Sequence, residues 1–400
     1  MNINKETPIS QRGSMIMPLF LFFILLLLYV FSELESQEQR QYLHLTMGQI
    51  ETNTVHQMAN NSNSNITIIS NQTSSLDLDA KNFTMEGTAA LYDYRYDEAI
   101  NFYSKALGLE PNNTYALTGN AYALSKLSRY EEAVSYYDKA LALEPTNVTL
   151  LYLKADILPY LSKYDEAITV YDEILALEPQ NADALFNKGF DLGQLGKYDE
   201  AVAVYDKALA IDPRDIGVLY HKSIALDNLG RYEEAVAVYD KIISLQPDYE
   251  TQLAVLQAKA LALLTLGNYE EAIAVSDKVL SIEPNMIHAN ITKGEALFNL
   301  GRYDEAIAVF DKILAIYPDE IDVLNGKGDV LLNLGKYKEA ITIYDKVQSL
   351  AVGDNDAFVH AEDGKRLAIE VLSREDEKKQ MSSELIDNIT TTVNKNNNTL

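Results

Sequence analysis

The residue types that carry most enzyme and metal chemistry are scarce in this chain of 400 residues. It has no Cys, which excludes disulfides, thiolate zinc sites and Cys nucleophiles. Gly-x-Gly-x-x-Gly, phosphate-loop, His-Glu-x-x-His and Gly-x-Ser-x-Gly motifs do not occur either. The five His residues are too scattered to predict a His-rich metal centre: His44, His56, His221, His288 and His360. We therefore expect no enzyme activity, no cofactor and no metal site.

Carboxylates are the most abundant group that could take part in chemistry. Acidic residues outnumber basic ones by 59 to 33, which gives a net charge of −26 with His neutral. With so many acids, close pairs arise by accident and identify no general acid–base site. A strongly negative body repels phosphate backbones, so we expect no nucleic-acid partner.

The distinctive pattern is a repeat, which positions aromatic and acidic side chains at fixed intervals. Steps of 34 residues, with one step of 37, separate the prolines Pro111, Pro145, Pro179, Pro213, Pro247, Pro284 and Pro318. The same steps separate Tyr-acid-Glu-Ala motifs that begin at Tyr96, Tyr130, Tyr164, Tyr198, Tyr232, Tyr269 and Tyr303, with a Lys variant at Tyr337. Three extra residues near 250–252 account for the longer step. Such a period indicates one supersecondary unit repeated along the chain.

The unit at 182–215 predicts a helix–turn–helix. Asn181 is suited to cap the first helix, and Gly196 to end it in the left-handed conformation. Asp199 and Glu200 then favour the N-terminus of a second helix, which Pro213 ends. One such pair cannot bury its apolar faces alone, but stacked neighbours form a continuous core. The sequence therefore predicts an all-α solenoid.

The pattern closely resembles the tetratricopeptide repeat family. It combines a small residue in each first helix with an Ala and a following aromatic in each second helix, as in Gly189, Ala201 and Tyr205. Regular Tyr columns of this kind are expected to pack in the core. The resemblance implies a right-handed solenoid of eight units, expected at 80–113, 114–147, 148–181, 182–215, 216–252, 253–286, 287–320 and 321–354. A capping helix is expected at 355–374, and a disordered polar tail at 375–400.

Three departures from the pattern carry expectations. Pro159 should end the first helix of the third unit early. Ser276 replaces the aromatic in the sixth unit, where packing is expected to loosen. Columns of Lys (such as Lys188 and Lys222) and Asp (such as Asp172 and Asp206) recur with the repeats. We interpret them as a ladder of contacts between helices.

In the tetratricopeptide repeat family the first helices line a concave surface that holds a peptide or a partner helix. The matching aromatic positions are Tyr115, Tyr122, Tyr152, Tyr160, Phe186, Phe190, Tyr220 and Phe298. The matching acidic positions are Asp156, Asp183, Asp227, Glu295, Asp322 and Asp329. Some members clamp a C-terminal carboxylate with Lys and Arg, which these positions lack. A partner of basic and apolar character fits better, although the same side chains could instead pack between adjacent repeats.

The N-terminal region differs in character from the repeats. Residues 15–31 form an uncharged apolar run, preceded by Lys5 and Arg12 and followed by Glu33. This pattern predicts a signal-anchor with residues 1–14 in the cytoplasm and the body outside. A cleaved signal peptide, giving a secreted protein, and a buried helix are the alternatives.

Residues 32–79 are rich in Asn and Ser, a composition that predicts a flexible stalk. Glycosylation triplets occur at Asn60, Asn65, Asn71 and Asn82, although an Asn-rich chain also forms such triplets by chance. Taken together, the sequence predicts a non-enzymatic interaction scaffold or adaptor displayed outside the cytosol. The alternative is a structural, self-associating surface or envelope component without a dedicated peptide ligand.

Overall fold

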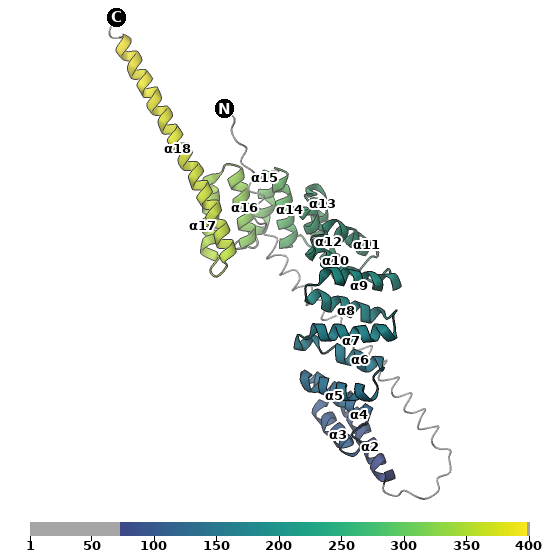
Figure 1. Ribbon diagram of the computed structural model, residues 1–400. Helices are drawn as coiled ribbons and strands as arrows, with labels where there is room; N and C mark the ends of the chain where they lie inside the picture. The colour runs from purple at the N-terminus through teal and green to yellow at the C-terminus, as the bar shows by residue number, and fades with distance from the viewer. Residues whose placement is uncertain (1–72, 398–400) are drawn as a thin grey trace. The chain divides into compact units, whose positions relative to one another are not determined.

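The computed structural model describes residues 73–397, with side chains from 78 to 385. The predicted anchor at 15–31, most of the predicted stalk, and Asn60, Asn65 and Asn71 lie outside these residues. The all-α prediction is confirmed, because every regular element between residues 73 and 397 is helical (Figure 1). No helix in that range is long and apolar enough to cross a membrane.

The helices alternate between first and second members of each repeat. The first helices are α2 (Thr73–Tyr92), α4 (Thr114–Lys126), α6 (Val148–Ala155), α8 (Ala182–Gln194), α10 (Ile216–Asn228), α12 (Tyr249–Thr265), α14 (Ile287–Asn299) and α16 (Ile321–Asn333). The second helices are α3 (Tyr96–Leu109), α5 (Tyr130–Leu143), α7 (Tyr164–Leu177), α9 (Tyr198–Ile211), α11 (Tyr232–Ser244), α13 (Tyr269–Ile282), α15 (Tyr303–Leu314) and α17 (Tyr337–Leu350). Helix α18 (Asn355–Asn397) follows the eighth pair.

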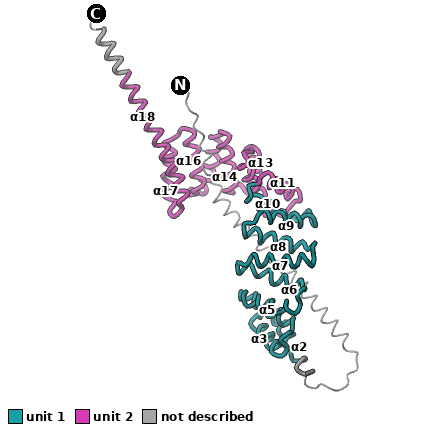
Figure 2. The backbone as a smooth tube through the Cα atoms, in the orientation of Figure 1, with its two compact units in different colours: residues 1–230 teal, residues 231–400 magenta. Residues whose placement is uncertain are grey.

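The chain divides into two compact units (Figure 2). Unit 1 ends at Gly230 and contains α2 to α10, whereas unit 2 begins at Arg231 and contains α11 to α18. Within each unit, every helix packs against the next one along the chain. This is the packing of a helical solenoid.

The helix ends form as the unit at 182–215 predicts. The Asn181 side chain caps α8 by accepting a hydrogen bond from the Ala184 amide at 3.0 Å. After α8, Gly196 takes a positive φ of 72°, which glycine adopts without Cβ strain. Asp199 and Glu200 occupy the first turn of α9, where carboxylates interact favourably with the helix dipole.

One column of aromatic side chains forms the core of the repeats, as predicted. All are between 0 and 2 % exposed: Tyr103, Tyr137, Tyr171, Tyr205, Tyr239, Phe310 and Tyr344. The small residue of the first helix makes room for this ring. A Cβ added at Gly189 would lie 2.5 Å from Cε1 of Tyr205, so no larger side chain fits there without a shift.

The first helices lie on the inner side of each unit. In each unit some consecutive first helices contact one another: α2 with α4 and α8 with α10 in unit 1, and α12 with α14 and α14 with α16 in unit 2. Consecutive second helices of a unit make few contacts or none. Helices on the inside of a curved stack approach more closely than those on the outside. The first helices therefore line the concave face of each unit.

The predicted Lys–Asp ladder is present in both units. Each Lys before the small residue of a first helix contacts the Asp of the preceding second helix, with Nζ–Oδ1 distances of 2.5 to 2.7 Å. These pairs are Lys154–Asp138, Lys188–Asp172, Lys222–Asp206, Lys259–Asp240, Lys293–Asp277 and Lys327–Asp311. Lys365 on α18 adds a contact with Asp345 that the sequence analysis missed.

Several predicted boundaries need correction. Helix α2 begins at Thr73, so residues 73–79 are helical rather than part of a flexible stalk. The extra residues near 250–252 lie in the first turn of α12, so the sixth unit begins before residue 253. Pro159 does shorten the third unit's first helix, because α6 ends at Ala155 and a 3₁₀ helix, η3 (Pro159–Leu161), follows.

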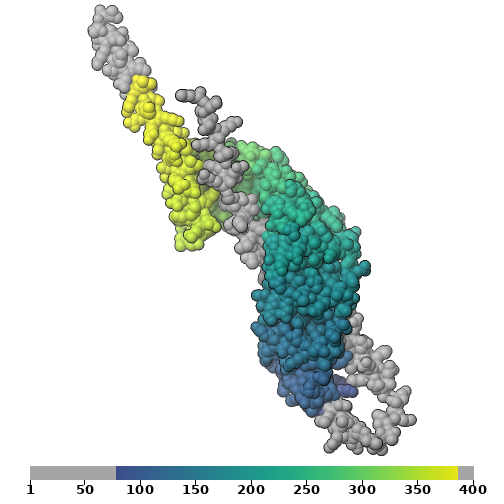
Figure 3. Space-filling view, in the orientation of Figure 1, coloured from purple at the N-terminus to yellow at the C-terminus, as the bar shows by residue number. Residues whose placement is uncertain are grey.

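The C-terminal region also differs from its prediction. Helix α18 continues to Asn397, whereas residues 375–400 were expected to be a disordered tail after a cap ending at 374. Residues 375–397 contain no Pro or Gly to end the helix. Pairs one turn apart, such as Arg374 with Glu370 at 2.6 Å, support it. The distal part of α18 extends beyond the other helices of unit 2 (Figures 1 and 3).

Candidate partner-binding site

The predicted groove residues divide between the two units. Unit 1 contains Tyr115, Tyr122, Tyr152, Asp156, Tyr160, Asp183, Phe186, Phe190, Tyr220 and Asp227, of which Asp227 is buried on α10. Unit 2 contains Glu295, Phe298, Asp322 and Asp329. Each set lies on or just after first helices, and the burial of each side chain decides whether a partner could reach it.

An aromatic cluster lies between α8 and α10 in unit 1. The rings of Phe186 and Phe190 meet the imidazole of His221 edge to face, with centroids 5.2 and 5.4 Å apart. All three side chains are half-buried. Burial lowers the pKa of His221 to about 4, so its ring is neutral at physiological pH. The cluster therefore presents a neutral, ring-lined surface, which is suited to apolar contact.

Two predicted contact residues, Tyr152 and Tyr220, are buried rather than exposed on this surface. Tyr152 is 8 % exposed, and its hydroxyl donates a hydrogen bond to Oδ1 of Asn181 at 2.5 Å. Tyr220 is 1 % exposed and packs against His221 with ring centroids 5.9 Å apart. Both rings are therefore packed inside the repeats, the arrangement that the sequence left open as an alternative.

The other predicted aromatics of unit 1 remain accessible to different degrees. Tyr115 is 55 % exposed, and Tyr122 is half-buried beneath Lys126, whose Nζ lies 5.0 Å from the ring centroid. Tyr160 is 66 % exposed and stacks on Tyr130 at 4.8 Å. The apolar surface of unit 1 thus extends beyond the cluster around His221.

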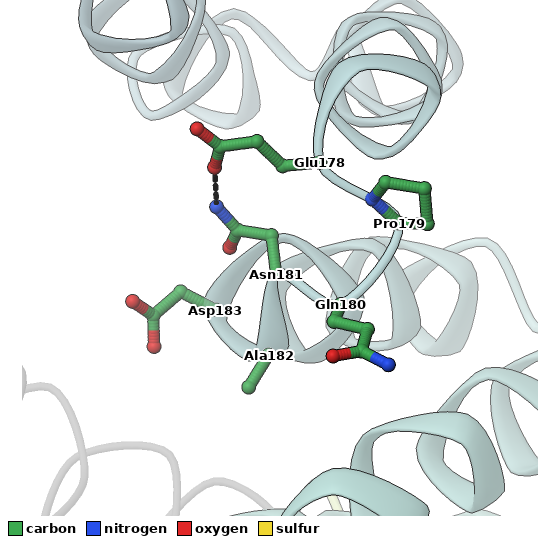
Figure 4. Close-up of a pocket in the computed structure, with 6 residues that line it drawn as sticks. All are labelled: Glu178, Pro179, Gln180, Asn181, Ala182 and Asp183. Carbon is green, nitrogen blue, oxygen red and sulfur yellow. Dashed lines mark hydrogen bonds between the residues drawn. The ribbon is translucent and has the colours of Figure 1, made fainter.

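A shallow, open hollow lies where α7 leads into α8 (Figure 4). Residues 178–183 line it, and across its rim Asn181 Nδ2 donates a hydrogen bond to the Glu178 carboxylate at 2.7 Å. Partial burial, together with nearby Asp215, raises the pKa of Asp183 at this site. Asp156 lies on the preceding repeat, where it accepts a hydrogen bond from the Tyr171 hydroxyl at 3.4 Å. Acidic groups therefore border the aromatic surface.

In unit 2 the concave face is acidic rather than aromatic. Phe298 is half-buried against Tyr303, with ring centroids 5.7 Å apart. Burial, followed by the charges of Asp329 and Asp322, raises the pKa of Glu295 to about 7. Within the residues whose side chains are described, no group of three or more His, Asp or Glu is arranged to hold a metal ion.

Sequence reasoning missed two residues of these surfaces. His221 directly follows Tyr220 and lies at the centre of the aromatic cluster. Asn325 lies between Asp322 and Asp329 on α16 and is 1 % exposed. The repeat register could have identified both, because each lies at or next to a position that matches the family's concave surface.

Two tetratricopeptide repeat models match the sequence. One matches residues 194–260, 263–327 and 300–358, and the other matches residues 152–216. Together they span more than half of the chain. The chain belongs to the tetratricopeptide repeat family. Residues 93–174 also match the model of the anaphase-promoting complex, cyclosome, subunit 3.

Solved structures of similar proteins include further tetratricopeptide repeat proteins. One from Parabacteroides merdae is 20 % identical, with 64 % of this chain and 98 % of that chain covered and a TM-score of 0.44. MamA from Desulfovibrio magneticus is 23 % identical, with coverages of 42 and 95 % and a TM-score of 0.40. YrrB, described as a tetratricopeptide repeat protein with an unusual peptide-binding site, is 20 % identical, with coverages of 48 and 97 % and a TM-score of 0.40. No curated protein matches the sequence.

Proposed function

We propose that this protein is a non-enzymatic scaffold or adaptor whose concave face holds a peptide or helix of a partner protein. Membership of the tetratricopeptide repeat family supports an interaction role. The observation that carries the proposal is the cluster of Phe186, Phe190 and His221, which presents three half-buried, uncharged rings on adjacent first helices. Such rings supply contact area at low cost in side-chain entropy.

The binding energy comes mainly from covering these rings. Completing the burial of a largely buried Phe such as Phe186 contributes about 1 kcal/mol, at roughly 25 cal/mol for each Å² of apolar surface removed from water. The neighbouring carboxylates of Asp156 and Asp183 favour partners that also carry positive charge. The expected partner therefore combines apolar and basic side chains.

The test is partner capture by purified full-length protein, with Phe186 and Phe190 both replaced by Ala. The matched control replaces Leu177 and Ile211, which are 44 and 41 % exposed at the ends of second helices in unit 1. We expect the Phe186→Ala/Phe190→Ala variant to lose at least nine-tenths of the captured partner, and the control to retain it. Circular dichroism checks that both variants fold. Equal capture by both variants would disprove the groove mechanism, and capture only of further copies of this chain would favour a structural, self-associating component.

We also propose that the repeats are displayed outside the cytosol, held by an anchor at residues 15–31. The support comes from the sequence: the uncharged run, the basic residues before it and the acidic residues after it. The triplet at Asn82 lies just after the predicted stalk, and its Asn side chain is exposed on α2. Asn290 also lies in a triplet but is 2 % exposed, so the folded protein offers no access to it.

Protease treatment of intact cells tests the location. Release of repeat peptides, with sugar on Asn65, Asn71 or Asn82, is the expected result. An uncut and unmodified body in intact cells, but a cut one in lysed cells, would place the repeats inside.

A further inference from the structure

Two further glycosylation triplets lie in neighbouring repeats of unit 1, at turns of the same kind. The triplet that begins at Asn112 is in the turn between α3 and α4, and the one that begins at Asn147 is at the end of the turn between α5 and α6. These repeats are 34 residues apart, so the counterpart of Asn147 is Asn113 and not Asn112. This shift of one residue places the two acceptor side chains in different environments.

The Asn147 side chain holds its turn together. Its Oδ1 atom accepts a hydrogen bond from the Leu150 amide at 3.2 Å, which caps α6, and its Nδ2 atom donates to the Glu144 carboxylate at 2.7 Å. Figure 4 shows the same arrangement one repeat further on, where Asn181 points to Glu178. Because Nδ2 is the atom that carries the sugar in a glycosylated Asn, modification requires Asn147 to leave both partners.

The Asn112 side chain has no such role. It is exposed, and it makes no hydrogen bond or ion pair among the described residues. Its counterpart in the turn of Figure 4, Gln180, is exposed as well. The cap of α4 belongs instead to Asn113, whose Oδ1 atom accepts a hydrogen bond from the Ala116 amide at 3.0 Å. A sugar on Asn112 therefore leaves that cap intact.

We propose that Asn112 is an N-glycosylation site of the folded protein and that Asn147 is not. In the transfer, Nδ2 of Asn112 attacks the anomeric carbon of a sugar carried on a lipid pyrophosphate. A C–N bond forms, the C–O bond to the pyrophosphate breaks, one amide proton passes to solvent, and the lipid pyrophosphate leaves. The inference rests on the proposed display outside the cytosol, because such triplets are acceptors on the surface of exported proteins.

The test is sugar transfer in vitro, which does not depend on where the cell places the repeats. Full-length protein, made in a host without glycosylation, is incubated with a single-subunit oligosaccharyltransferase and its lipid-linked donor. Mass spectrometry measures the occupancy of each triplet. Synthetic peptides of residues 107–119 and 141–153 measure how well the enzyme accepts each triplet without the fold. Asn112→Gln and its matched control Asn147→Gln check the assignment on the intact protein.

We expect both peptides to be modified. In the folded protein, occupancy relative to the matching peptide should be at least tenfold higher at Asn112 than at Asn147. Asn112→Gln should remove one sugar from the intact mass, and Asn147→Gln should remove none. Equal relative occupancy at the two sites would overturn the proposal, and so would an unmodified Asn112 in either the protein or its peptide.

The result is separable from that of the proposed location. If intact cells release repeat peptides in which Asn112 is bare while Asn65 or Asn71 carries sugar, the display stands and the Asn112 site is wrong. If the body is cut only in lysed cells, the location fails. Transfer in vitro then still decides whether the fold leaves Asn112 open to modification.

Discussion

Replacing Asp240 by Asn should destabilise the protein more than replacing its ladder partner Lys259 by Met. The Lys259 side chain is only 9 % exposed, whereas that of Asp240 is 57 % exposed, and the two charges are 2.6 Å apart. Asp240→Asn leaves a buried ammonium with only the Glu271 carboxylate, at 3.5 Å, to compensate it. Lys259→Met removes the pair but also removes the charge that had to be desolvated, and it keeps an apolar stem of similar length.

The magnitudes follow from this difference in burial. Breaking a fully buried pair from one side costs about 3–5 kcal/mol, and an exposed pair contributes about 0–1 kcal/mol. The Lys259–Asp240 pair lies between these limits, so we expect Asp240→Asn to lower the free energy of unfolding by about 1–2 kcal/mol. Lys259→Met should cost about 0.5 kcal/mol, and the double variant no more than Lys259→Met alone.

The assay is urea unfolding followed by circular dichroism, at low salt and at about 1 M NaCl, where the Debye length falls to about 3 Å. The matched control is the Lys222–Asp206 pair, in which the Lys side chain is 18 % exposed. Its double-mutant cycle should show a smaller coupling free energy. Equal losses from Asp240→Asn and Lys259→Met, with no coupling and no salt dependence, would refute the reasoning.

Three further predictions concern the core and the C-terminal cap. Ser276→Ala should raise the free energy of unfolding by about 1 kcal/mol, because the fully buried Ser276 hydroxyl has no hydrogen-bond partner in the described part of the chain. Ser223→Ala should instead lower it, because that hydroxyl donates to a backbone carbonyl at 2.6 Å; the opposite order in urea unfolding would contradict this account. The hydrogen bond and ion pair with Asp329 raise the pKa of His360. The stabilisation that this pair gives the folded protein is therefore complete below about pH 6.5, and it is lost as the pH rises through the folded-state pKa. Hydrogen exchange of α18 should therefore be slower at about pH 6 than at pH 8, after correction for intrinsic rates, and His360→Gln should remove the difference. Gly189→Ala should lower the free energy of unfolding by about 1–3 kcal/mol, and with it the melting temperature, because the added Cβ would overlap the buried Tyr205 ring. An unchanged melting temperature would show that this ring moves freely.

Much of the fold could be predicted because the same physical signals recur in each repeat. The Asn181 cap and the positive φ at Gly196 depend only on local sequence, and both are present. The pairing of Lys188 with Asp172 could be predicted from two columns with a common period. Repetition confirms each weak signal several times over.

The features that the sequence left open or missed depend on packing or on the absence of a signal. Tyr152 and Tyr220 occupy positions that match the family's concave surface, yet neighbouring repeats cover both rings. Residues 375–397 look polar enough to be unfolded, but nothing in them ends the helix that precedes them. The repeat register places Asn325 at a position that matches the family's concave surface, but its near-complete burial comes from packing that the sequence does not show.

The most direct test of the account is site-specific photo-cross-linking in living cells, with benzoylphenylalanine placed at Phe190 or, as control, at Ile211. Phe190 lies in the ring cluster of the concave face, and Ile211 is exposed at the end of α9 in the same repeat. We predict that the probe at Phe190 cross-links to one partner protein, at a peptide containing apolar and basic residues, and that the probe at Ile211 does not. Cross-linking of that partner at Ile211, with none at Phe190, would contradict the claim that the first helices form the binding surface.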